Sequence, residues 1–203
     1  MADRFIAVAG NIGAGKTTLT TWLTSTYDMR PAFEPFENNP YLDDFYKDMG
    51  AWGFHSQVWF LAHKYRLHLE LEKTPGHIVQ DRTIYEDAEI FAASLARSRN
   101  MSKRDYATYT EMYEAMKSGL QRPDLLIYLT CSVRATRRRI KQRGRESEQD
   151  IPARYLRKLN VLYAEFIDRW DHCPILVLDT EKLDYLGDLV DALEFRNRIE
   201  KYL

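Results

Sequence analysis

The sequence has few of the features that mark secreted, membrane or metal-binding proteins. Its 203 residues include two cysteines, Cys131 and Cys173, whose spacing matches neither a disulfide framework nor a metal site. No apolar run approaches the ~20 residues that cross a bilayer. Only a short apolar run follows Arg4, so we expect no signal peptide. These observations predict a cytoplasmic protein with no membrane partner.

An excess of charge of either sign is also missing. The chain has 29 Lys and Arg against 30 Asp and Glu, a formal net charge of -1, so no bulk field attracts it to nucleic acid. Repeats, low-complexity tracts and Gly/Ser-rich linkers are absent from the sequence. The hydrophobic fraction of 45% is ordinary for a globular protein. We therefore expect a single domain spanning residues 1–203, with no nucleic-acid partner.

The most informative segment present is a glycine-rich loop at residues 10–17, which fits the pattern G-x-x-x-x-G-K-[ST]. It follows the apolar run Phe5–Ala9 and precedes a helical stretch, Thr18–Tyr27, as a phosphate-binding loop requires. Its backbone N–H groups and the helix N-terminus attract a phosphate. The predicted phosphate-binding residues of this segment are Gly10, Asn11, Ile12, Gly13, Ala14, Gly15, Lys16, Thr17 and Thr18.

Strands alternate with helices along the chain. Apolar runs typical of buried strands are Phe5–Ala9, Ile78–Asp81, Leu125–Thr130 and Ile175–Leu178, with a weaker fifth near 29–33. Helical spacing of apolar residues predicts helices over 54–69, 105–116 and 153–170. Together with the glycine loop, this order predicts an α/β protein with the three-layer P-loop NTPase fold. A parallel sheet of about five strands would carry helices on both faces, with an arginine-rich lid.

Ligands of such folds bind at the carboxyl ends of the strands, where three charged residues are expected. Asp81 ends the strand that begins at Ile78, and could hold Mg²⁺ together with the Thr17 hydroxyl. Arg82 could contact the substrate oxygen or the transferred phosphoryl group. Glu34 ends the weak second strand and is a plausible general base for an attacking hydroxyl. The alternatives are a surface ion pair for Asp81 and Arg82, and a solvated loop residue for Glu34.

Arginines concentrate between residues 134 and 145. Arg139 and Arg143 share one helix face, and Gly144 interrupts the helix beside Arg145. Guanidinium groups match phosphate geometry, so we interpret residues 139–151 as a lid that closes over phosphates. For Arg134, Arg137 and Arg138 a solvated basic face is the better interpretation. Binding of nucleic acid by the same patch is disfavoured by the net charge.

The predicted long helix carries two polar residues, Gln57 and Lys64, on one face. They could read a heterocycle by hydrogen bonds, but periodicity alone does not distinguish this from an exposed helix flank. The five histidines lack metal-ligand spacing, and the 13% aromatic content is more typical of a core than of a stacking platform.

These motifs together resemble the deoxynucleoside kinase family, in particular its bacterial deoxyadenosine, deoxyguanosine and deoxycytidine kinases, over nearly the whole chain. The resemblance is carried by the glycine loop, Phe33-Glu34-Pro35 with Asn39-Pro40-Tyr41-Leu42, Phe54-His55-Ser56-Gln57, Asp81-Arg82-Thr83-Ile84-Tyr85-Glu86-Asp87 and Arg139-Ile140-Lys141-Gln142-Arg143-Gly144-Arg145. It implies a cytoplasmic ATP-dependent enzyme, commonly a homodimer. Such an enzyme would phosphorylate the 5′-hydroxyl of a 2′-deoxyribonucleoside with Mg²⁺, in nucleotide salvage.

The resemblance also implies roles for individual residues. Glu34 would be the base and Arg82 would bind near the 5′-oxygen, with Asp81 toward Mg²⁺. Other positions that match the family's substrate and lid residues are Tyr46 and Glu148 for the sugar 3′-hydroxyl, Gln57 and Asp87 for the base edge, Phe91 for ring stacking, Lys64 where relatives often carry arginine, and Arg139, Arg143 and Arg145 for the lid. Tyr46, Glu148 and Phe91 are assigned from the resemblance alone.

The nucleobase that the enzyme would prefer is predicted less directly from the sequence. An aspartate at position 87 accepts hydrogen bonds and Gln57 can donate and accept, which favours a base with an amino group. Asn39 stands where animal relatives have tryptophan, which predicts a more open pocket wall. The expected order is adenine, then cytosine, with guanine also admitted.

Other classes of protein fit the residues less well. A nucleoside monophosphate kinase needs arginines outside the lid for the acceptor phosphate, and Arg82 is the one candidate in the sequence. A GTP-dependent switch needs an N-K-x-D box, which the sequence lacks. A non-catalytic relative is disfavoured by the intact Lys16, Thr17 and Glu34.

Overall fold

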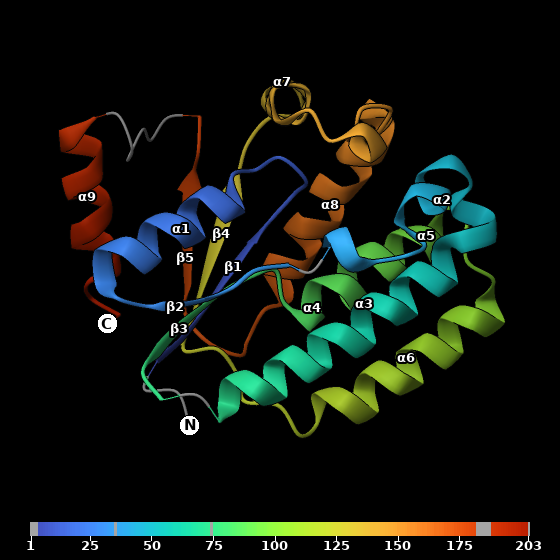
Figure 1. Cartoon of the computed structure of the whole chain (residues 1–203), viewed down its shortest axis with the longest axis horizontal. Coiled ribbons are helices and arrows are strands. Elements are labelled where there is room, and N and C mark those ends of the chain that lie inside the picture. Colours follow the sequence, from blue (N-terminus) through green and yellow to red (C-terminus); the bar gives the residue numbers. More distant parts are fainter. Residues whose placement is uncertain (1–3, 35, 74, 182–187, 203) are drawn as a thin grey trace.

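The computed structural model describes residues 4–34, 36–73, 75–181 and 188–202. A parallel five-stranded sheet lies at its centre in the order β2-β3-β1-β4-β5 (Figure 1). The strands are β1 (Arg4–Gly10), β2 (Arg30–Ala32), β3 (His77–Asp81), β4 (Leu125–Thr130) and β5 (Ile175–Asp179). The predicted P-loop NTPase fold and all five predicted strands are confirmed. The central strands were predicted correctly because both of their faces are buried, and a strand buried on both faces has a continuous apolar run.

Helices cover both faces of the sheet (Figure 1). They are α1 (Lys16–Tyr27), α2 (Leu42–Lys47), α3 (Met49–Glu72), α4 (Ile84–Glu86), α5 (Ala93–Arg97), α6 (Lys103–Lys117), α7 (Val133–Arg143), α8 (Ala153–Arg169) and α9 (Leu189–Ile199). Three shorter turns are η1 (Phe36–Asn38), η2 (Asp87–Ala92, a π-helix) and η3 (Glu146–Glu148). The three predicted long helices correspond to α3, α6 and α8. The sequence analysis did not predict α2, α4, α5 or α9.

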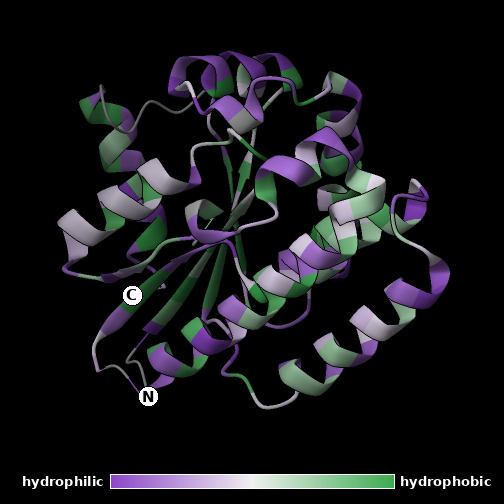
Figure 2. Ribbon diagram, turned by 45° about the vertical axis from the view of Figure 1, so that its right-hand side comes forward, coloured by the Kyte–Doolittle hydropathy of each residue, from purple (hydrophilic) through white to green (hydrophobic). Residues whose placement is uncertain are grey.

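Alternate residues of each strand enter two separate cores. Ile6 and Val8 of β1 pack in a cluster with α1 and α9, whereas Ala7 and Ala9 face a larger cluster with α3, α6 and α8. Figure 2 shows the hydrophobic strands at the centre of the molecule. Because side chains alternate between faces along a strand, β1 is held from both sides. The loop that follows it is therefore rigidly placed.

The parallel register brings the ends of β1 and β3 to one edge of the sheet. Val8 pairs with Asp81, and the Arg82 N–H donates to the Val8 carbonyl at 3.0 Å. Arg82 adopts the left-handed conformation with φ 62°, which is rare for a residue with a Cβ. This kink ends β3 beside the glycine loop. Backbone strain of this kind concentrates at functional sites.

One helix of the larger core is interrupted by a π-turn. Residues 84–97 begin as α4, continue as η2 and end as α5. Single π-turns inserted in helices are frequently found at functional sites. Here the π-turn contains Asp87 and Phe91, both of which line the cavity described below.

Candidate active site

The glycine loop forms a closed turn between β1 and α1. Gly13 has φ 76°, and a Cβ there would lie 2.8 Å from the Thr136 carbonyl oxygen. Gly15 has φ 101° at the N-cap of α1. Both positions favour glycine because residues with a side chain rarely adopt such positive φ angles. Lys16 Nζ donates to the Gly10 and Asn11 carbonyls at 2.9 and 3.1 Å. The lysine side chain therefore folds back along the glycine loop.

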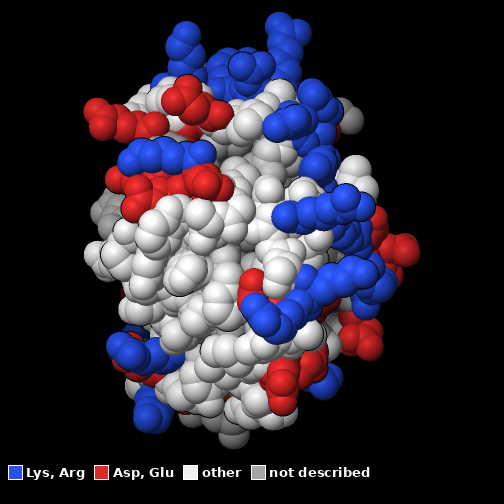
Figure 3. All heavy atoms as spheres, turned by 90° about the vertical axis from the view of Figure 1, so that its right-hand side faces the viewer, with Lys and Arg blue, Asp and Glu red and all other residues white. Residues whose placement is uncertain are grey.

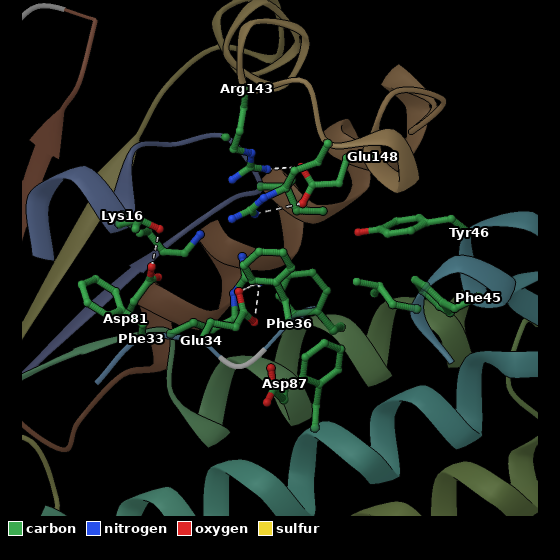
Figure 4. Close-up of a pocket in the computed structure, with 18 of the residues that line it drawn as sticks. Lys16, Phe33, Glu34, Phe36, Phe45, Tyr46, Asp81, Asp87, Arg143 and Glu148 are labelled. Atoms are coloured by element: carbon green, nitrogen blue, oxygen red, sulfur yellow. Dashed lines mark hydrogen bonds and ion pairs between the residues drawn. The ribbon is translucent and has the colours of Figure 1, made fainter. Parts of the chain in front are cut away.

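A cavity of about 450 Å³ opens beside this loop (Figure 4). That volume is within the range of ordinary small-molecule sites. The predicted residues that line it are Ile12, Gly13, Lys16, Thr17, Glu34, Tyr46, Gln57, Asp81, Arg82, Asp87, Phe91, Arg143, Arg145 and Glu148. They come from five distant parts of the chain.

Glu34 lies at the centre of a buried network of charges. Arg82 Nη1 donates to both of its carboxylate oxygens, at 2.9 and 2.8 Å, and Lys64 Nζ donates to Oε1 at 3.2 Å. Burial favours the neutral acid, but Arg82, Lys64 and Lys16 outweigh it and hold the pKa of Glu34 well below its usual range. Glu34 therefore remains a carboxylate facing the glycine loop across the cavity.

Lys64 connects Glu34 to Asp87. The lysine is fully buried, and its Nζ lies 2.8 Å from Asp87 Oδ1. It does not line the cavity, so it supports both carboxylates from behind. Burial, followed by the charge of Glu34, raises the pKa of Asp87 to about 6, although Lys64 opposes this rise. A buried cation between the buried Asp87 and the partly buried Glu34 avoids the cost of leaving any of the three charges unpaired.

Two acceptor atoms on residues that line the cavity have no hydrogen-bond partner in the described part of the chain. Among the described residues, Asp87 Oδ2 and Gln57 Oε1 are buried and have no hydrogen-bond partner. A buried polar atom without a partner is costly, so each is a candidate contact for a ligand. Arg82 lies 4.4 Å from the ring centroid of Phe91, which fixes that ring at the border of this region.

The Thr17 hydroxyl donates to Asp81 Oδ2 at 2.6 Å. Within the described part of the chain, Asp81 Oδ1 is buried without a partner. A threonine hydroxyl and a free carboxylate oxygen are the donor types that hold Mg²⁺ at a phosphate site. The two residues therefore fit such an ion. No cluster of three or more His, Cys, Asp and Glu side chains that could hold a metal occurs among the residues described.

The arginines of the predicted lid have different positions. Arg143 and Arg145 line the cavity and both pair with Glu148. Arg139 does not line it: its guanidinium donates to the Ala14 carbonyl at 3.1 Å and to Thr180, which supports the glycine loop. Thr18, Gly10, Asn11, Ala14 and Gly15 are also absent from the cavity lining.

Tyr46 and Glu148 face each other across the upper part of the cavity (Figure 4). Burial, then the negative charge of Glu148, raises the pKa of Tyr46 well above its ordinary value. The phenol therefore keeps its proton and can donate a hydrogen bond. Asn39 does not line the cavity; its side chain is buried and bonds Ser56 Oγ at 3.0 Å.

Several residues of the site had no predicted role. Those that line the cavity are Phe33, Phe36, Asn38, Leu42, Phe45, Phe60 and Tyr155. Glu86 and Tyr163 lie beneath the glycine loop: Glu86 accepts from the Gly10 N–H at 3.3 Å, and the Tyr163 hydroxyl lies 2.7 Å from the Gly10 carbonyl. Thr83 and Glu86 form a capping box, a spacing visible in the sequence. Tyr163 has no such signal.

The sheet order, the phosphate loop and the adjoining cavity define a P-loop nucleotide-binding protein. The family model for "Deoxynucleoside kinase" matches residues 6–203. The chain belongs to the deoxynucleoside kinase family, as its motifs predicted.

Named relatives support this assignment. The chain is 40% identical over 188 residues to a deoxyadenosine/deoxycytidine kinase of Bacillus subtilis, covering 92% of this chain and 87% of the relative. It is also 40% identical to a deoxyadenosine kinase of Dictyostelium discoideum, with 96% and 82% covered. The structure of a deoxyadenosine kinase from M. mycoides with bound dATP superposes with a TM-score of 0.85 at 30% identity, covering 97% of this chain and 99% of that one.

Proposed function

We propose that this protein transfers the γ-phosphoryl group of ATP to the 5′-hydroxyl of a 2′-deoxyribonucleoside, with deoxyadenosine preferred, in nucleotide salvage. The observation that carries the proposal is that Glu34 and the glycine loop line one cavity, with Arg82 beside them. A nucleoside lying between them would present its hydroxyl to the carboxylate and toward the γ-phosphate. Residues 1–203 would act as one kinase domain, with residues 139–151 as its lid.

The proposed mechanism is in-line transfer. Glu34 orients the 5′-hydroxyl and takes its proton. Because the transition state of phosphoryl transfer is loose, the proton can leave late, and a carboxylate with a low pKa suffices. Arg82, Lys16, Arg143 and Arg145 neutralise the charge that spreads over the phosphoryl oxygens, while Arg139 supports the loop. Lid closure excludes water and suppresses hydrolysis of ATP.

The proposed base preference rests on the two free acceptors, Gln57 Oε1 and Asp87 Oδ2. The amino group of adenine or cytosine provides N–H donors for both, whereas thymine lacks this group. Phe91 would stack on the ring, while Tyr46 and Glu148 would bind the 3′-hydroxyl. The names of the Bacillus subtilis and Dictyostelium discoideum relatives agree with this order.

Phosphorylation of the four deoxynucleosides, followed by nucleoside-dependent release of ADP, tests the proposal. We expect deoxyadenosine to give the highest kcat/KM, then deoxycytidine, with deoxyguanosine also phosphorylated. Thymidine as the best substrate would refute the base assignment. Activity on nucleoside monophosphates alone would support a nucleoside monophosphate kinase instead.

Nucleoside binding should depend on pH through Asp87. The amino group of the base donates to the ionised carboxylate, and the pKa of Asp87 is raised to about 6 by burial. We therefore expect the KM for deoxyadenosine to be low above this pH and to rise as the pH falls through it, while kcat changes less. KM measured from about pH 5 to about pH 8 checks this. Asp87→Asn should remove the dependence, and a rise that persists in this variant would contradict the assignment.

Mg²⁺ is the metal that Thr17 and Asp81 would hold, and when bound it would neutralise phosphate charge. Asp81→Asn should raise the Mg²⁺ concentration for half-maximal activity by roughly 10-fold or more. Titration of activity with Mg²⁺ measures this. Asp43→Asn, at an exposed position, is the matched control. An unchanged Mg²⁺ dependence would remove Asp81 from the metal site.

We further propose a homodimer in the cytoplasm. The face seen in Figure 3, on the side of α2 and α5, has a broad central area of uncharged side chains with charged residues at its borders. Depletion of charged residues is characteristic of the core of a protein interface. Light scattering of the purified chain gives the mass that tests the dimer. No helix in the described part of the chain is long and apolar enough to cross a membrane.

A further inference from the structure

The lid residue Arg145 is held by two different contacts. Its guanidinium carbon lies 3.5 Å from the ring centroid of Phe36, and its Nη1 lies 3.4 Å from Glu148 Oε1. A hydrogen bond at that distance is near the outer limit, and Arg143 engages the other oxygen of Glu148. The hydrogen bond to Glu148 is thus long for its type, whereas the stack on Phe36 is close for a cation–π contact, so the stack is the better-formed contact of Arg145.

Phe36 and Arg145 belong to segments that are distant in the sequence. Phe36 begins η1, two residues after Glu34, and Arg145 lies between α7 and η3. Both side chains line the cavity. Figure 4 shows Phe36 beside Glu34, with Arg143 and Glu148 above it. The stack thus connects the segment that carries the proposed base to the lid.

The two contacts should respond differently to substrate. Glu148 is assigned to the 3′-hydroxyl, so a bound nucleoside would compete for its oxygens. The face of Phe36 attracts a guanidinium through the ring quadrupole, and a nucleoside hydroxyl does not compete for that interaction. Phe36 would then be the contact that still fixes Arg145 when the site is loaded.

We propose that Phe36 is a positioning residue, whose ring holds the Arg145 guanidinium over the loaded cavity where the phosphoryl group is transferred. This inference rests on the kinase function proposed above. An aliphatic residue at position 36 would fill similar space but would lack the quadrupole. The effect of the aromatic face can therefore be tested separately from the effect of side-chain volume.

The experiment compares Phe36→Leu and Phe36→Tyr, each alone and in an Arg145→Ala background. Phe36→Leu should lower kcat for deoxyadenosine by about 3- to 30-fold, with a smaller change in nucleoside KM. Phe36→Tyr keeps an aromatic face and should stay within about twofold of the wild type. In the Arg145→Ala background, Phe36→Leu should have no further effect on kcat, because the two residues act as one unit. Phe36→Met serves as a second aliphatic variant if the leucine variant does not fold.

Other outcomes would overturn the inference. An equal loss of kcat in both backgrounds would show that Phe36 acts as a cavity wall, independently of Arg145. Wild-type kcat in both aliphatic variants would show that the stack is not used. If the wild type phosphorylates none of the four deoxynucleosides, the proposed function itself fails; if it is active, these variants test Phe36 alone.

Discussion

Replacing Glu34 by Gln is expected to lower kcat by ~10²-fold or more with a modest change in KM, because the amide cannot accept the proton of the attacking hydroxyl. The shape of the side chain is kept, so nucleoside binding is largely preserved. Steady-state kinetics with deoxyadenosine measures the effect. The same change at Glu165, a carboxylate that pairs with Arg97 outside the cavity, is the matched control and should leave kcat unchanged.

The charge network predicts a second property of the Glu34→Gln variant. The substitution removes the anion between Arg82 and Lys64, while Lys64 retains Asp87. We expect a lower Tm, because two buried cations then face each other with less compensation. Thermal unfolding separates this loss from the chemical effect. Activity near that of the wild type would remove Glu34 as the base.

Arg82→Lys should lower kcat by ~10²- to 10³-fold, the usual range for loss of one transition-state donor. The positive charge remains, but a single ammonium cannot reproduce the present contacts. Arg82 binds both oxygens of Glu34, lies 3.4 Å from the Gly10 carbonyl and rests on Phe91. Lysine lacks the planar fork that makes these contacts together.

The control for this variant is Arg66→Lys, at an exposed position on α3. Both substitutions keep a Cβ, so the left-handed backbone at position 82 carries the same strain in the variant as in the wild type. A kcat within about threefold of the wild type would show that charge alone is required at position 82.

Much of the fold followed from local patterns. The strands β1, β3 and β4 were predictable because parallel strands covered on both faces are mainly apolar. β5 lies at the edge of the sheet with Val177 46% exposed, but its apolar run still identified it. The helix α2 was missed because it is short and lies among loop-forming residues. The π-turn η2 was missed because its period differs from that of the helical pattern used to find helices.

The site was only partly predictable. Glu34, Asp81 and Arg82 were identified because they end strands of one parallel sheet, whose carboxyl ends share an edge. The sequence left Lys64 as either a substrate-binding residue or part of an exposed helix flank, whereas the structure places it behind the cavity, paired with Glu34 and Asp87. No sequence signal pointed to Tyr163 or to the stack of Phe36 on Arg145.

By itself, the sequence determined the glycine loop, the alternation of strands with the longer helices along the chain, and the identity of the strand-end carboxylates. These features depend on residues that are close together in the sequence, and on the regular spacing of the buried apolar residues along each strand or helix. Only the tertiary structure decided which charges meet, the pKa directions of Glu34 and Asp87, and the partner of Arg145. Such properties depend on distances of a few ångströms between residues far apart in the chain, and electrostatic energies change steeply over those distances.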